Sequence, residues 1–135
     1  MNIKTLNKNT FKDYTDMIER NAYEHNPNWK GCYCHFYHNT FSIQEWMKRS
    51  SESNKEASYQ SMLKHELFGF LLYDGDRCVG WVNANDQKYY HRLKNELSVF
   101  NDKKTAVTMC YIIDSNYRNQ GNARRLLDYA IKYYK

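Results

Sequence analysis

A polar loop with a glycine near its centre precedes the helical pattern at the end of the chain. This loop, residues 114–123, reads DSNYRNQGNA. The first N–H groups of a helix have no partner inside the helix, and the helix dipole adds partial positive charge at that end. The missing side chain at Gly121 lets an anion approach the backbone, and the small Ala123 lets the helix lie close to the preceding strand. The loop therefore predicts a phosphate-binding site.

Two cysteines and two histidines form a second cluster: Cys32, Cys34, His35 and His38. All four side chains can bind zinc, but paired cysteines in structural zinc sites are separated by about two to four residues. Here a single residue separates them, and the adjacent Cys34 and His35 can hardly both bind one ion. We therefore expect no metal site. We expect a loop beside the substrate or a half-buried strand, in which Cys32, Cys34 and His38 would share one face.

The second half of the chain has clear secondary-structure signals. Two apolar runs flank an Asp-Gly turn at 74–76 and predict a β-hairpin over 68–84. Residues 86–100 are predicted to be helical in part, and the β-rich run at 105–113 is predicted to be a strand. A helix beginning near Gln120 is indicated by one apolar stripe at helical spacing, made of Ala123, Leu126, Leu127, Ala130, Ile131 and Tyr134.

The first half is predicted to be mainly helical. A short strand over 3–6 is followed by Thr10, the predicted N-cap of a helix that should end before Pro27. Ser42 is the predicted N-cap of a second helical region, which is expected to break near residues 50–53. An acidic residue lies three positions after each of these caps, as in a capping box.

Composition limits the class of protein. A chain of 135 residues allows one domain with a well-buried core, and 13 tyrosines imply that this core is rich in aromatic rings. The net charge of +5 permits an anionic partner, such as a phosphate-bearing cofactor or nucleic acid. No apolar run reaches the length of a membrane span or an export signal, so we expect no membrane partner, reduced cysteines and a cytoplasmic location.

Residues 118–123, RNQGNA, resemble motif A of the GNAT superfamily of N-acetyltransferases. The family pattern is Arg/Gln-x-x-Gly-x-Gly/Ala, between the fourth strand and the third main helix. The predicted order of elements is similar to that of the family, apart from an extra helical insertion at 86–100. Residues 29–34 and 79–86 also resemble one GNAT subgroup. The resemblance implies an α/β (α+β) fold, in which helices flank a mixed, mainly antiparallel sheet.

The resemblance also implies a reaction and a site. Acetyl-CoA would donate an acetyl group to a primary amine of a small molecule or peptide. Backbone N–H groups of the loop would hold the pyrophosphate of the coenzyme. The end of the last strand would pair with its pantetheine arm, and arginine side chains would bind its phosphate groups. The residues carried over in these roles are Ile112, Ile113, Arg118, Asn119, Gln120, Gly121, Asn122, Ala123 and Arg124.

The general base is the least defined residue. Asp86, which follows the hairpin, is our first choice, and a surface role is its alternative. His91 and Glu96 are further candidates. Glu24, His25 or a water relay could also accept the amine proton.

GNAT domains continue beyond the motif A helix, and that second part includes the frequent general-acid tyrosine. We therefore expect residues 1–135 to be the N-terminal two-thirds of a single GNAT-like domain, truncated after its third main helix. Such a chain would leave Ile112, Ile113 and the edge of their strand exposed. An exposed apolar edge predicts self-association, for example as a homodimer.

Two other functions are compatible with the sequence. A non-catalytic acyl-CoA-binding or protein-interaction domain could have the same fold. The mixtures of tyrosine and basic residues at 88–92 and 132–135 could stack on single-stranded nucleic acid. Helices with inward aromatic rings explain these mixtures better, so we expect no nucleic-acid partner.

Overall fold

The structure is a computed structural model that describes residues 1–22, 31–96 and 105–135. The expected end of the first helix, before Pro27, lies outside these ranges. The strands are β1 (Asn2–Thr5), β2 (Gly69–Asp74), β3 (Arg77–Asp86) and β4 (Ala106–Ile113). The helices are α1 (Phe11–Met17), α2 (Ile43–Met47), α3 (Ser51–Leu63), α4 (His91–Glu96) and α5 (Asn122–Tyr134), and a π-helix follows α1 at Ile18–Ala22. None of the described helices has the length and apolar character needed to cross a bilayer.

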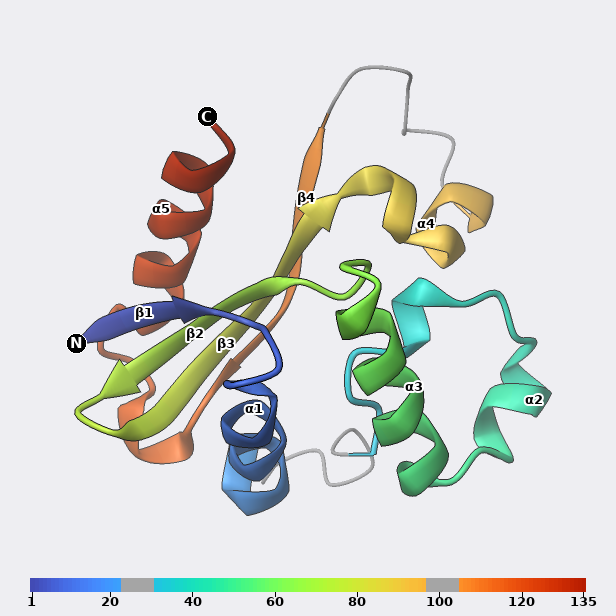
Figure 1. Cartoon of the computed structure of the whole chain (residues 1–135), viewed down its shortest axis with the longest axis horizontal. Coiled ribbons are helices and arrows are strands. Elements are labelled where there is room, and N and C mark those ends of the chain that lie inside the picture. The colour runs from blue at the N-terminus through green and yellow to red at the C-terminus, as the bar shows by residue number, and fades with distance from the viewer. Residues whose placement is uncertain (23–30, 97–104) are drawn as a thin grey trace.

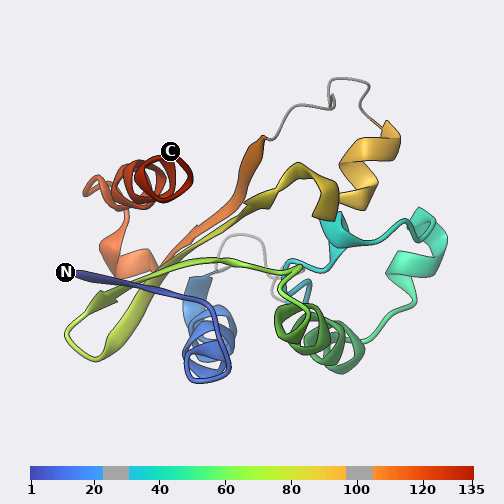
Figure 2. The same cartoon turned by 45° about the horizontal axis from the view of Figure 1, so that its top comes forward.

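The four strands form one sheet in the order β1-β2-β3-β4, and every described pairing is antiparallel. Helices α1 and α5 lie on opposite sides of this sheet (Figure 2). Helices α2, α3 and α4 gather at the end of the sheet away from the β2–β3 turn (Figure 1). The predicted fold class and the predicted hairpin are therefore confirmed, with Gly75 in the turn at a φ of 61°.

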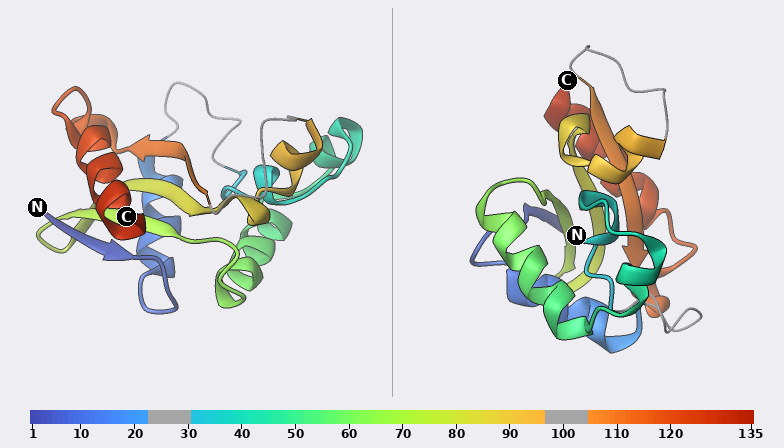
Figure 3. Two further views of the ribbon diagram at one scale, coloured as in Figure 1. Left: turned by 90° about the horizontal axis from the view of Figure 1, so that it is seen from above. Right: turned by 90° about the vertical axis from the view of Figure 1, so that its right-hand side faces the viewer.

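Strand β2 is buried on both faces because each face meets a separate core. Leu71 and Tyr73 pack on the side of α1, whereas Phe70 and Leu72 pack on the side of α5. Successive side chains of a strand point to opposite faces, so the continuous apolar run of β2 serves both cores. Seen from above, α5 lies over the strands near the β2–β3 turn (Figure 3, left).

Helix α5 presents only part of the predicted apolar stripe to the sheet. Leu126 and Ala130 are buried as expected, but Ala123 and Ile131 are exposed. The predicted apolar stripe is wider than the sheet surface that covers it. Tyrosines at the end of the helix extend the contact instead, and the Tyr133 ring lies 5.0 Å from the Phe70 ring.

Side-chain caps define helices α2 and α3. Ser42 and Glu45 form the predicted capping box, and Ser50 accepts a hydrogen bond from the N–H of Ser53 at the predicted break. Thr10 occupies the N-cap position of α1 but makes no side-chain cap. Its hydroxyl instead donates to the carbonyl of Thr5 at 2.9 Å. The capping-box prediction is therefore wrong for α1.

The segment that contains the cysteine and histidine cluster is not a strand. It forms turns and a 3-10 turn at Phe36–His38, because its side chains bond to the sheet and to the turn after β3. Cys34 Sγ accepts a hydrogen bond from Trp81 Nε1 at 3.2 Å. The His38 ring lies between Tyr89 O, 2.7 Å from Nδ1, and Asn83 Nδ2, 3.1 Å from Nε2. Within the ranges that the structure describes, no group of three or more potential ligands could hold a metal ion.

A fully buried carboxylate ties the end of β4 to the rest of the fold. Asp114 is 0% exposed, and its Oδ2 lies 3.3 Å from an Arg77 nitrogen and 3.5 Å from an Arg20 nitrogen. Its Oδ1 accepts from the N–H of Asn116, and its own N–H donates to Val79 O. One side chain thus joins β4, the start of β3, the π-helix and the loop that follows.

Replacement of this carboxylate should destabilise the protein. Asp114→Asn leaves two arginines without their buried anion, and we expect a loss of about 2–3 kcal/mol in the free energy of unfolding. Asp128→Asn is the matched control, because Asp128 forms a solvent-exposed pair with Arg124. That variant should lose less than about 0.5 kcal/mol. Urea denaturation compares the two, and equal losses would contradict the role given to Asp114.

Acid should destabilise the protein through His38. Burial lowers the pKa of His38 to about 4 in the folded protein. A histidine in the unfolded chain has a pKa of about 6.5. Between these two pH values the unfolded chain therefore binds a proton at His38 that the folded protein does not. The resulting stability is present above about pH 6.5 and is lost as the pH falls towards 4. We expect His38 to account for about 2–3 kcal/mol between pH 7 and pH 4.5. Denaturation at both pH values should therefore show a smaller difference for His38→Gln, and an unchanged difference would contradict this assignment.

Candidate active site

Strand β4 contains a bulge at its centre. Trp81 pairs with Ile112 and Asn83 pairs with Met109, so that Cys110 and Tyr111 stand opposite Val82 alone. Cys110 has a φ of 56°, in the left-handed region that residues other than glycine seldom adopt. A bulge of this kind leaves one residue outside the hydrogen-bond ladder. The edge strand of the described sheet therefore offers an unpaired backbone group at its midpoint.

The loop after β4 is held in place by hydrogen bonds from side chains at its own positions to nearby backbone carbonyls. Arg118 Nε donates to Ile113 O at 3.0 Å, and Asn122 Nδ2 donates to Tyr117 O at 2.9 Å. These bonds bring the start of α5 to the end of β4. The predicted loop residues therefore come together, with α5 beginning at Asn122, two residues after the predicted start.

Gly121 is the feature of this loop that suits an anion. It is the N-cap residue of α5, its φ is 80°, and a side chain at this position would meet no atom within 4 Å. Asn119 also adopts a positive φ, of 61°. The first turn of a helix directs unpaired N–H groups towards such open space. The loop therefore fits a phosphate or pyrophosphate group.

The arginines near the loop are not equally placed to meet phosphate charge. Arg118 is held against the end of β4 through Nε, whereas Arg124 pairs with Asp128 on the surface at 3.0 Å. Ile113 is partly buried, but Ile112 is only 4% exposed because it joins the core on the side of α1. The expectation that Ile112 would be exposed is therefore wrong.

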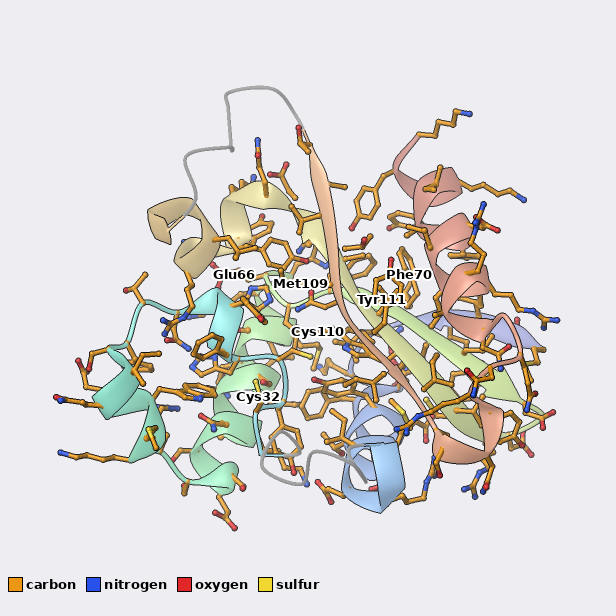
Figure 4. All side chains as sticks on the ribbon, turned by 180° about the vertical axis from the view of Figure 1, so that it is seen from behind. Cys32, Glu66, Phe70, Met109, Cys110 and Tyr111 are labelled. Atoms are coloured by element: carbon orange, nitrogen blue, oxygen red, sulfur yellow. The ribbon has the colours of Figure 1, made fainter. Side chains whose placement is uncertain are left out.

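A pocket of about 820 Å³ opens between β4 and the segment 31–54. Cys32 and Trp46 contribute to its wall from that segment, and Met109 and Tyr111 contribute from β4. Figure 4 shows Cys32 near the labelled residues of the bulge. The pocket thus reaches the bulge, on the side of the sheet that faces the first half of the chain.

The cysteines beside the bulge are poor nucleophiles. A hydrogen bond with Cys34, together with burial, raises the pKa of Cys110, so its thiol stays protonated. The same bond lowers the pKa of Cys34, which is only 1% exposed. Burial raises the pKa of Cys32 to about 11. A thiolate is the reactive form of cysteine, so none of the three is arranged for attack on a substrate.

Asp86 lies apart from the bulge. It pairs with Ala106, which is four residues, or roughly 13 Å, along β4 from Cys110. Its Oδ1 accepts a hydrogen bond from the N–H of Lys88 at 3.0 Å and caps a short 3-10 turn. His91 is exposed on α4, and the alternatives Glu24 and His25 lie outside the described residues. The general base therefore stays a prediction.

Two aspects of the site were missed from the sequence. The role of Asp114 depends on arginines that are distant along the chain, and nothing in the local pattern indicates them. The positive φ of Cys110 lies inside a run of β-forming residues, so the sequence gives no signal of the bulge.

The alternative of a surface that stacks on single-stranded nucleic acid is not supported at residues 90 and 92. The side chains of Tyr90 and Arg92 are buried.

The fold has counterparts among known protein structures. An aminoglycoside antibiotic 6'-N-acetyltransferase from Acinetobacter haemolyticus aligns with 99% of this chain and 74% of its own, at 13% identity and a TM-score of 0.57. A second aminoglycoside N-acetyltransferase, in complex with CoA, aligns with 98% of this chain and 67% of its own, at 11% identity and a TM-score of 0.59. A GCN5-related N-acetyltransferase from Ralstonia eutropha aligns with 98% of this chain and 74% of its own, at 9% identity and a TM-score of 0.56. At these identities the likeness establishes the fold alone.

The sequence comparison is more specific. No curated protein matches the chain. The model of the acetyltransferase (GNAT) family matches residues 19–135, which include the bulge in β4, the loop at Gly121 and helix α5. The chain therefore belongs to the GNAT family of acetyltransferases.

Proposed function

We propose that this chain binds acetyl-CoA and supports transfer of its acetyl group to a primary amine. The observation that carries the proposal is the juxtaposition of two features on one strand. The bulge at Cys110 interrupts β4 at its midpoint, and the open, positive-φ loop at Gly121 follows its end. An extended ligand with an anionic group at one end could contact both features.

The loop would hold the anionic end of the coenzyme. The backbone N–H groups from Asn119 to Ala123 would bind the pyrophosphate, and Gly121 leaves the space that this group needs. Arg118 would act mainly by fixing the loop against Ile113 O. The coenzyme would supply an acetyl group activated as a thioester.

The open edge of β4 would orient the rest of the coenzyme. Backbone groups of Ile112 and Ile113 can form strand-like hydrogen bonds with an extended amide chain. The backbone N–H that the bulge frees at Cys110 or Tyr111 is the type of donor that stabilises negative charge on a carbonyl oxygen. These roles need only main-chain atoms, so they tolerate varied side chains along β4.

The acceptor amine would enter from the pocket beside Cys32 and Met109. Asp86 remains our proposed base, acting through water because of its distance from the bulge. We also propose that residues 1–135 belong to a single domain that works in the cytoplasm.

A second candidate is an acyl-CoA-binding domain without catalytic activity. The position of Asp86 favours it, because the structure brings no carboxylate among the described residues to the wall of the pocket. Release of the coenzyme thiol in the presence of a panel of amines separates the two functions. Binding of acetyl-CoA without thiol release would favour the second.

Substitution of the loop glycine should weaken binding of acetyl-CoA. We expect Gly121→Ala to reduce affinity about tenfold or more, because a methyl group would occupy the anion space. Gly75→Ala is the matched control. Gly75 has a comparable positive φ of 61° and open space around it, but it lies in the β2–β3 turn. Both variants should lose similar stability, about 1–2 kcal/mol.

Thermal unfolding with and without acetyl-CoA measures this effect. The ligand should raise the melting temperature of the wild type and of Gly75→Ala, and should raise that of Gly121→Ala much less. An equal rise in all three proteins would place the coenzyme elsewhere. No rise in the folded wild type would contradict the proposed function itself.

A further inference from the structure

The pocket beside β4 has an aromatic wall, and an arginine reaches it. Phe36, Tyr37 and Trp46 line it together with Met109. Among the described residues that line it, Arg49 is the one charged side chain. A volume of about 820 Å³ lies within the usual range for small-molecule sites. A ligand here would meet apolar surface and one guanidinium group.

Arg49 is held in a defined position. Its Nε donates to Asn54 Oδ1 at 2.7 Å, and its guanidinium carbon lies 4.8 Å from the centre of the Phe41 ring. Asn54 is only 5% exposed and is itself fixed by a bond of 2.8 Å from its Nδ2 to Gly31 O. Within the part of the chain that the structure describes, no carboxylate forms an ion pair with Arg49. A positioned guanidinium of this kind is suited to an anionic group of a ligand.

The aromatic wall is also preformed. The buried Arg92 places its guanidinium 3.9 Å from the centre of the Phe36 ring and donates to the carbonyls of Phe36 and Phe41. The Phe36 and Trp46 rings meet edge to face at 5.1 Å. These contacts hold Phe36, whose ring lines the pocket, and Phe41, whose ring lies beneath Arg49. Little ordering would remain to oppose binding.

We propose that the acceptor for this pocket is an α-amino acid with an aromatic side chain. Arg49 would pair with the carboxylate, and the rings of Phe36 and Trp46 would contact the side chain. The amine would then remain near the bulge of β4 for acetyl transfer, so this inference rests on the proposed function. Aminoglycosides carry several ammonium groups, which Arg49 would repel. The pocket therefore differs in chemistry from what the names of the structural relatives suggest.

Calorimetric titration of the whole chain tests this specificity with three amines. L-Phenylalanine carries the ring and the carboxylate, phenethylamine lacks only the carboxylate, and kanamycin is a polycation. We expect L-phenylalanine to bind about tenfold or more tightly than phenethylamine, and kanamycin to bind most weakly. Equal binding of the first two, tightest binding of kanamycin, or no binding of any of the three would overturn the inference.

Substitutions at Arg49 identify the group responsible. Arg49→Gln should weaken the binding of L-phenylalanine about tenfold or more, and should change the affinity for phenethylamine by less than about twofold. Arg49→Lys keeps the charge without the planar fork and should give a smaller loss, which separates recognition from a failure to fold. Lys48→Gln, an exposed neighbour with the same change in charge, should alter neither affinity. An unchanged preference in Arg49→Gln would overturn the role of this residue.

The inference and the proposed function can fail separately. If L-phenylalanine binds through Arg49 but no thiol is released from acetyl-CoA, the pocket is assigned correctly and acetyl transfer is not. If thiol is released with phenethylamine or kanamycin but not with L-phenylalanine, acetyl transfer stands and the acceptor class is wrong.

Discussion

The buried carboxylate of Asp114 is the constraint on which the site depends. It lies where β4 ends, and it joins that end to Arg77 at the start of β3 and to Arg20 in the π-helix. A buried charge is stable only when it is paired and hydrogen-bonded, so these three segments must come together in one geometry. The loop that follows begins from this fixed point. The position of Gly121, and hence of the proposed phosphate site, follows from it.

The bulge is a second irregular feature of β4, and it changes the pairing of this strand with β3. A regular ladder would use the backbone groups of residues 109–112 in pairing with β3, whereas the bulge leaves one residue out. The unfavourable backbone of Cys110 is compatible with folding because its neighbourhood is well packed. Trp81 is fully buried against Tyr14, and its indole N–H bonds to Cys34. Packing in the core on the side of α1 thus offsets the unfavourable backbone conformation at the bulge. A strand without a bulge would not need this compensation.

Local signals made much of this architecture predictable. The Asp-Gly turn, the capping box at Ser42, the break at Ser50 and the loop around Gly121 each depend on residues within a few positions of one another. Non-local contacts decided the rest. Thr10 follows the capping pattern, yet its hydroxyl bonds to Thr5 because β1 ends beside it.

The segment after Cys32 shows the same limit. A half-buried strand and a loop were both expected there, and hydrogen bonds to Trp81, Asn83 and Tyr89 fold the segment into turns. The face of α5 was predicted in part, since the width of an apolar stripe does not reveal how much of it the sheet will cover. The predicted site residues at the loop came together, whereas Asp86 did not join the bulge, because strand length and register set that distance.

Amide hydrogen exchange tests most directly whether the loop after β4 holds the coenzyme. In the proposed complex, the backbone N–H groups from Asn119 to Ala123 bind its pyrophosphate. Saturating acetyl-CoA should slow exchange at these amides about tenfold or more and leave the amides of α3 unchanged, because α3 lies away from the loop. Unchanged exchange at residues 119–123, in protein whose raised melting temperature shows that acetyl-CoA is bound, would contradict this assignment.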